Sequence, residues 1–312
     1  MEHLPYLTFK NWLRSIGEEG AYKITIDAGF SCPNRDGTLS QAGCIFCDNA
    51  SFSPAHRELA GKTLAEQIEN GKKFGKRFGY DKFIAYFQAF TNTYGTVDEL
   101  KQKYDAIVDD EEIAGLAIGT RPDCVSDDVL DLIASYQSRF PKLLYLELGM
   151  QSAHDKTLER INRGHLHKAT INAVYRAKKY GLKIVLHSIL GLPEESDEEI
   201  METADEVARL NPHSIKIHHL YVCENTALAK MYKVGEYKAL EYQNYIELVS
   251  KYIARLPENM VIQRLVGELA GKGIIAPNWG KSKAQVIQDI VKYMNSNNLR
   301  QGRNYIDKKR ED

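Results

Sequence analysis

The chain has 312 residues, of which 27% are charged, and its formal net charge at pH 7 is -1. This length is enough for one large α/β domain or two modest ones, and the composition is ordinary for a globular protein. The balanced charge argues against a protein that coats nucleic acid through a uniform basic field, although not against a local basic site. The beginning of the chain has no apolar segment of the signal-peptide kind, and no uncharged run approaches the roughly 18 residues of a membrane span. We therefore expect a cytoplasmic protein without a membrane partner.

In chain order, six short apolar runs rich in β-branched and aromatic residues predict strands. Most are apolar at nearly every position, as expected for strands that are covered on both faces. Amphipathic segments lie between them, and three begin with a capping-box pattern, at Thr63, Thr96 and Ser196. This alternation predicts βαβ units and therefore a parallel sheet. The predicted strands are 22–30, 83–90, 115–120, 143–152, 183–190 and 214–222.

The repeat of about 30 to 35 residues matches the β/α unit of a barrel, but six units are two fewer than a closed eightfold barrel needs. A doubly wound open sheet has the same local signature, so periodicity leaves both arrangements open. Beyond the sixth strand the pattern changes to two amphipathic helices, at 236–255 and 281–296, with a further strand suggested at 261–268. We predict two parts: a core over residues 1–235, and a mainly helical extension over residues 236–312 that packs on the core.

The segment directly after the first predicted strand contains three of the five cysteines, Cys32, Cys44 and Cys47, with the spacing C-x11-C-x2-C. Ligands gather at the carboxyl ends of strands in parallel α/β folds, so this loop is placed for function. A [4Fe–4S] cluster is commonly held by four thiolates, and with three of them one iron keeps the open position that a catalytic centre needs. Two alternatives stay open: a zinc ion that His56 or Asp48 also ligates, and three unrelated buried cysteines.

This loop resembles the cluster-binding loop of radical S-adenosylmethionine (SAM) enzymes, and its long first gap is similar to that of the Elongator catalytic subunit. Together with five further blocks, it looks like the smaller YtqA/YhcC group, over roughly residues 5–300. The resemblance implies an α/β fold, a partial (β/α)6 TIM-like barrel of the radical SAM type with a C-terminal helical extension. It also implies a [4Fe–4S] cluster with Cys32, Cys44 and Cys47 as ligands, and SAM as a second cofactor. The blocks are FQAFTNTY (87–94), GTRPDC (119–124), ELGMQSAHDKTLERINRGH (147–165), HSILGLPEES (187–196) and IKIHHLYV (215–222).

In radical SAM enzymes, SAM binds the open iron through its amino and carboxylate groups, and its reductive cleavage forms a 5'-deoxyadenosyl radical that abstracts hydrogen from the substrate. The resemblance places Gln88, Thr91 and Asn92, at the end of the second strand, beside the SAM ammonium, where the family usually has a Gly-Gly-Glu-like motif. Side-chain and backbone oxygens accept from an ammonium, so these residues suit that role. A plain polar loop between strand and helix is the alternative.

Arg163 and Arg121 are the candidates for the SAM carboxylate, because a carboxylate favours a bidentate donor, and Arg163 is preferred because the Asn-Arg-Gly-His block is similar to the family there. Glu147 and Gln151 have the same parity on the fourth strand, so both side chains point to one side, and an unpaired buried Glu would be costly. We therefore expect both of them at the cofactor or the substrate. His187 and the turn after it resemble the region that packs the adenine of SAM, with a core histidine as the alternative.

Three further residues are candidates for substrate contact: Arg121 at the end of the third strand, and Lys216 and His218, which share parity on the sixth strand. Each has a structural alternative as a polar residue that seals a strand end. Two basic stretches, residues 71–80 and the tail from Arg300 to Arg310, are candidates for phosphate contacts with RNA. A charge run is usually a solvated face, and this alternative stays open.

The Elongator resemblance implies that the substrate is the wobble uridine of tRNA. The YtqA/YhcC resemblance implies a more particular reaction, conversion of 5-carboxymethylaminomethyluridine to 5-aminomethyluridine, with a reducing partner such as flavodoxin or ferredoxin. We expect no acetyl-CoA chemistry, because residues 225–312 are too short for the acetyltransferase domain of the Elongator subunit. A radical SAM enzyme with a small-molecule or protein substrate, and a non-catalytic zinc-stabilised RNA-binding protein, are the two alternatives.

Overall fold

The computed structural model describes residues 4–48, 61–267 and 273–307, and seven of its strands form one sheet with parallel neighbours. The strand order β1-β2-β3-β4-β5-β6-β8 follows the chain and never reverses. A doubly wound sheet reverses its order at a switch point, whereas a barrel does not. The order therefore decides in favour of the barrel arrangement. The strands are β1 (Ala21–Ile26), β2 (Lys82–Phe87), β3 (Ile113–Thr120), β4 (Leu144–Gln151), β5 (Lys183–Leu190), β6 (Ser214–His219) and β8 (Val261–Arg264).

The sheet is curled, so that side chains from distant strands meet inside it. Lys23 on β1 donates from Nζ to Gln263 Oε1 on β8 at 2.8 Å, although these two edge strands are not neighbours in the sheet. The same ammonium lies 2.8 Å from Glu147 on β4. Neighbouring strands are about 4.8 Å apart, so a flat sheet would hold β1 and β4 much too far apart for this contact. The prediction of an α/β partial barrel is confirmed, and β8 is its seventh strand.

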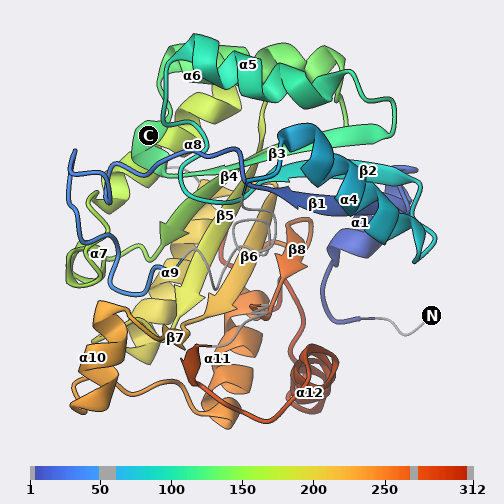
Figure 1. Ribbon diagram of the computed structural model, residues 1–312. Helices are drawn as coiled ribbons and strands as arrows, with labels where there is room; N and C mark the ends of the chain where they lie inside the picture. Colours follow the sequence, from blue (N-terminus) through green and yellow to red (C-terminus); the bar gives the residue numbers. More distant parts are fainter. Residues whose placement is uncertain (1–3, 49–60, 268–272, 308–312) are drawn as a thin grey trace.

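Helices cover the outer face of the curled sheet, as Figure 1 shows. The capping boxes predicted at Thr63, Thr96 and Ser196 begin three of these helices, and in each one the hydroxyl accepts from the backbone N–H three residues later. Such a cap contributes about 1 kcal/mol to a helix. Among the helices of the described segments, none combines the length and apolar character that a membrane span needs. The helices that follow strands β1 to β5 are α4 (Leu64–Lys76), α5 (Val97–Val108), α6 (Asp127–Ser135), α7 (Asp155–Arg160), α8 (His167–Lys179) and α9 (Asp197–Leu210).

The segment after residue 235 contributes both to the sheet and to the outer layer. It supplies β8, and its helices α11 (Tyr242–Arg255) and α12 (Lys283–Ser296) pack one on the other, with α11 also against α9. The short helix α10 (Ala227–Lys233) precedes it, and strands β7 (Val222–Cys223) and β9 (Ile274–Ala276) pair beside it. A division of the chain into two parts at residue 235 stays a prediction.

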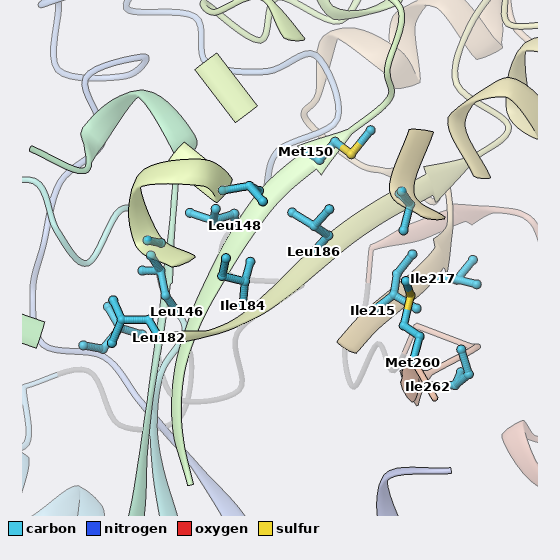
Figure 2. Packing of buried hydrophobic residues seen from close by; sticks show 14 of the residues in the cluster. Leu146, Leu148, Met150, Leu182, Ile184, Leu186, Ile215, Ile217, Met260 and Ile262 are labelled. Carbon is cyan, nitrogen blue, oxygen red and sulfur yellow. The ribbon is translucent and has the colours of Figure 1, made fainter. Parts of the chain in front are cut away.

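The main core lies between the sheet and the helices. Outward residues of neighbouring strands, such as Leu146 and Leu148 on β4, Leu186 on β5 and Ile217 on β6, are fully buried there and form one layer (Figure 2). Complete burial of one such side chain contributes about 1.5 to 3 kcal/mol. Because the outward positions carry this core, the inward positions of the same strands can carry polar groups.

A second, smaller core closes the end of the barrel at which the strands begin. Trp12 and Leu13 of α1 (Phe9–Ser15) pack there with Tyr145 and Val185 of the inner face. The rings of Trp12 and Tyr145 meet edge to face, with centroids 6.3 Å apart. This apolar plug fills one end of the barrel, so the polar interior faces the opposite end, where the strands terminate.

Candidate active site

A cavity of about 250 Å³ lies at the carboxyl ends of the strands, where the barrel interior meets the cysteine loop. Its wall combines the thiols of the loop with polar and aromatic side chains from β2 to β6 and from β8. Among the predicted site residues, Asn92 and Lys216 are not part of the wall. The predicted residues that line the cavity are Cys32, Cys44, Cys47, Gln88, Thr91, Arg121, Glu147, Gln151, Arg163, His187 and His218.

The cysteine loop follows β1 and brings its three thiols to one side of the cavity. All five cysteines of the chain are free, so no disulfide competes for them. Burial raises the pKa of the Cys47 thiol to about 11, and the neighbouring Cys44 and Cys32 add to this effect while Arg35 opposes it. The three sulfurs therefore lie within electrostatic reach of one another. A metal centre would bind the three sulfurs as thiolates, and their protons would be released on binding.

The Asn-Arg-Gly-His block holds the cysteine loop in place. Asn162 donates from Nδ2 to Gly43 O at 2.7 Å, and its own carbonyl accepts from Asn34 Nδ2 at 2.6 Å. Gly164 has a φ of +76°, and a Cβ there would lie 2.9 Å from Asn34 Oδ1. Sequence reasoning missed Asn34 and Asn162, although both stand inside the quoted motifs. Their role is visible only when the two motifs meet in space.

The donor set around the thiols fits an iron–sulfur cluster. Asn34 Nδ2 and Arg163 Nη1 each lie 3.6 Å from Cys44 Sγ, and such donors to sulfur tune the potential of a cluster. Among the described residues, no three His, Cys, Asp or Glu side chains are grouped closely enough to hold a single metal ion. A cubane spreads its ligands over separate corners, so it needs the sulfurs farther apart than one zinc ion does. Asp48 therefore completes no single-ion site here, and His56 belongs to a segment that the structure does not describe.

The end of β2 forms the part of the wall next to the loop. Gln88 and Thr91 line the cavity, and the Thr91 N–H donates to Ser31 O at 3.2 Å. Asn92 is buried, and its Nδ2 donates to Gly119 O at 2.7 Å and to Phe87 O at 3.2 Å. Asn92 thus ties the ends of β2 and β3 together, which corresponds to the structural alternative for this loop.

Two arginines of the cavity wall, Arg163 and Arg121, differ in how their guanidinium groups are hydrogen-bonded. Arg163 donates from Nη2 to Gly149 O at 2.8 Å, while its buried Nε has no hydrogen-bond partner among the described residues. A Cβ on Gly149 would lie 2.7 Å from that Nη2, so glycine leaves room for the guanidinium. Arg121 forms a bidentate pair with Asp123, at 2.9 and 2.8 Å, and donates to Arg163 O at 2.8 Å. Arg121 therefore holds the backbone of the Asn-Arg-Gly-His block at Arg163, whereas the Nε–H group of Arg163 remains as a donor for a ligand.

Glu147 is the centre of a charged network at the bottom of the cavity. Its carboxylate accepts from Lys23 at 2.8 Å and from His187 Nε2 at 2.9 Å, and it also bonds to Lys216. Burial alone would raise the pKa of Glu147, but Lys216, Lys23 and His187 hold it well below its usual range. Sequence reasoning missed Lys23, whose signal was a lone lysine in an apolar strand.

Lys216 lies beneath the cavity rather than in its wall. Its ammonium bonds to Glu147 and lies 4.2 Å from the centroid of the Tyr86 ring. Burial lowers the pKa of Lys216, and the attraction of Glu147 opposes this effect. Contact with a substrate would therefore be indirect, through Glu147 or Tyr86.

Two histidines above this network are held neutral. Burial lowers the pKa of His187 to about 4, although its bond to Glu147 works in the other direction. Burial, helped by Arg264 and His187, keeps the pKa of His218 well below its ordinary value. The two rings lie side by side, with centroids 5.5 Å apart. Both histidines thus offer the cavity neutral imidazoles at neutral pH.

The first basic stretch is a weaker RNA-binding candidate than its composition indicates. Lys72 pairs with Asp110 at 2.7 Å, and Lys76 pairs with Glu112 at 2.6 Å. This end of α4 also leads into the beginning of β2, away from the carboxyl ends of the strands. In the C-terminal stretch, the last three basic residues, 308–310, lie beyond the described part of the chain.

Two family models match the sequence: the Radical SAM superfamily over residues 32–207, and the Radical_SAM C-terminal domain over residues 212–296. The first model spans more than half of the chain and begins at Cys32, the first thiol of the site. The chain belongs to the radical SAM superfamily, and the predicted membership is confirmed.

The chain is also similar to two curated proteins and to one solved structure. The chain is 34% identical to the YtqA protein of Bacillus subtilis over 298 residues, which cover 96% of this chain and 92% of YtqA. It is 29% identical to the tRNA uridine(34) acetyltransferase of Methanocaldococcus jannaschii over 189 residues, or 59% of this chain and 33% of that protein. The solved structure of Methanocaldococcus infernus Elp3 without residues 1–46 matches with a TM-score of 0.69 at 21% identity, over 90% of this chain and 64% of that one. The predicted similarity to YtqA and to Elongator subunits is confirmed.

Proposed function

We propose that this radical SAM family member modifies the wobble uridine of tRNA, and that it converts 5-carboxymethylaminomethyluridine to 5-aminomethyluridine. The observation that carries the proposal is the single cavity in which three thiols on one side meet a charged network on the other. A relative that is named as a tRNA uridine(34) acetyltransferase supports the choice of tRNA and of the uridine at position 34. Abstraction of hydrogen from the carbon between the amine and the carboxylate would give a stabilised radical, so loss of the carboxymethyl group suits radical chemistry.

The cofactors are assigned from the donor set of the cavity. Cys32, Cys44 and Cys47 would hold a [4Fe–4S] cluster, and a reducing partner such as flavodoxin or ferredoxin would supply its electron. When bound, the cluster and SAM supply a 5'-deoxyadenosyl radical that abstracts hydrogen. Arg163, with an unpaired Nε, is suited to the carboxylate of SAM, and Gln151 lies beside it in the wall.

The remaining residues orient the substrate and manage its protons. His187 donates from Nε2 to Glu147 as a neutral imidazole, because its pKa is lowered to about 4. This bond and the two lysines keep the Glu147 carboxylate ionised and immobile. The charged network at the bottom of the cavity would hold the modified side chain of the nucleoside in one orientation, and this would limit side reactions of a reactive intermediate.

The test is conversion of the nucleoside in vitro. The protein is reconstituted anaerobically with iron and sulfide, reduced, and incubated with SAM and bulk tRNA from a strain that lacks the gene. Mass spectrometry of the digested tRNA should show loss of 5-carboxymethylaminomethyluridine and gain of 5-aminomethyluridine. If 5'-deoxyadenosine forms while all nucleosides stay unchanged, the substrate is a small molecule or protein instead. If the reconstituted protein binds zinc and no iron, the enzymatic proposal fails altogether.

A further inference from the structure

Arg264 enters the cavity because of an irregularity in the seventh strand. The pairing of β6 with β8 shifts so that Ile215 faces Ile262 while the next residue, Lys216, faces Arg264. Gln263 is thus an extra residue in β8, a β-bulge, and bulges re-aim side chains near active sites. Gln263 points inward to Lys23, and Arg264 lines the cavity as well. Strict alternation would have turned one of these two neighbours toward the outer core.

Among the described residues, Arg264 is also a cavity cation whose side chain has no hydrogen-bond partner and no counterion. Among the described residues of the wall, Arg35 donates to Cys47 O, Arg121 pairs with Asp123 and Arg163 bonds to Gly149 O. By contrast, no hydrogen bond or ion pair joins the side chain of Arg264 to any described residue. Among the described residues, its guanidinium therefore stays available to an anionic ligand.

The charge balance of the cavity floor supports this reading. Glu147 is the one carboxylate among the described residues of the wall, and it already bonds to Lys23, Lys216 and His187. With Lys23 and Arg264 set against Glu147, the net charge at the bottom of the cavity is positive whether Lys216 is protonated or not. A buried positive excess is costly until a ligand neutralises it.

Arg264 acts on a different region of the cavity from the thiols. Arg264 is paired in register with Lys216 on β6, and its charge lowers the pKa of His218 and Lys216, whereas Arg163 Nη1 lies 3.6 Å from Cys44 Sγ. A ligand held at the thiols thus lies near Arg163 and can accept a hydrogen bond from it. A second ligand, reaching the floor beside the two histidines, meets Arg264.

We propose that Arg264 binds the carboxylate of the substrate side chain and makes that carboxylate a requirement for recognition. This inference rests on the proposed function, since 5-carboxymethylaminomethyluridine carries such a carboxylate and 5-aminomethyluridine does not. The guanidinium forms a charge-assisted pair with the incoming group, and the neutral imidazole of His218 lines the same cavity. The residue thereby distinguishes substrate from product and favours product release.

The experiment measures binding without turnover. The reconstituted protein with SAM, and without reductant, is titrated with tRNA that carries 5-carboxymethylaminomethyluridine or 5-methylaminomethyluridine, which keeps the secondary amine and lacks the carboxylate. Wild type should bind the carboxylate-bearing tRNA about 10- to 100-fold more tightly, the value of a charge-assisted bond. Arg264→Gln should bind both tRNAs alike, and Arg264→Lys should retain part of the preference.

Arg14→Gln is the matched control, because it removes the same charge from α1 at the opposite end of the barrel. It should keep the full preference of wild type. The inference is overturned if wild type does not discriminate, if Arg264→Gln keeps the preference, or if this variant loses affinity for both tRNAs equally. A matching loss of SAM affinity in Arg264→Gln would also overturn it, because the bound carboxylate would then be that of SAM. Nucleoside conversion by wild type tests the proposed function separately.

Discussion

Replacement of Glu147 by Gln tests the interior network most directly, because one carboxylate serves three donors there. Its side chain is 0% exposed, and its oxygens lie 2.8 Å from Lys23 Nζ and 2.9 Å from His187 Nε2, with Lys216 as the third partner. Gln keeps the shape but removes the charge, which leaves two lysines uncompensated. Loss of one partner of a buried ion pair costs about 3 to 5 kcal/mol. We expect the free energy of unfolding of E147Q to fall by that amount.

Urea unfolding followed by circular dichroism measures this loss, and Glu18→Gln is the matched control. Glu18 also bonds to two lysines, Lys82 at 2.9 Å and Lys142 at 3.0 Å, but these lysines are 45% and 52% exposed. Exposed pairs contribute about 0 to 1 kcal/mol, so E18Q should remain close to wild type. Equal and small losses in E147Q and E18Q would refute the reasoning.

A double variant keeps the test decisive if E147Q does not fold. E147Q/K216M removes one cation together with the carboxylate, so one of the two uncompensated lysines is eliminated and only Lys23 remains. Neutral replacement of a buried pair costs much less than removal of one partner. The double variant should therefore be more stable than E147Q, and a lower stability would contradict the network.

Three further predictions concern the thiols, the arginine beside them and a buried histidine. Cys44→Ala should lose its iron after reconstitution while Cys124→Ala keeps it; equal iron in both would contradict the ligand assignment. Gly149→Ala places a Cβ 2.7 Å from Arg163 Nη2 and should weaken SAM binding about 10- to 100-fold in equilibrium dialysis; unchanged affinity would exclude Arg163 from the SAM site. The depressed pKa of His187, near 6.5 ordinarily and about 4 here, means that its contribution to stability is present above pH 6.5 and lost as the pH falls toward 4. Wild type should lose up to about 3 kcal/mol over this window, and H187Q should show a flatter profile; identical profiles would show that His187 is not held neutral.

Local patterns in the sequence predicted the units of the fold but not how many of them join the sheet. The capping boxes and apolar runs depend on neighbours in the chain, so they could be read directly. β8 was only suggested, because four residues of strand carry little pattern of their own and belong to the sheet only through pairing with β6. The choice between a barrel and a doubly wound sheet likewise depended on strand order, which no local signal encodes.

The sequence by itself determined the chemical class of the site, because three closely spaced cysteines after a strand are brought together by one loop whatever the rest of the chain does. It also determined which strand positions share a face. Only the tertiary structure decided which charges meet: Lys23, Glu147 and Lys216 come from three strands that are far apart in the chain. The bulge that turns Arg264 inward is likewise a product of register between β6 and β8. Contacts of this kind depend on the curl of the whole sheet, which brings strands that are not neighbours together around one interior.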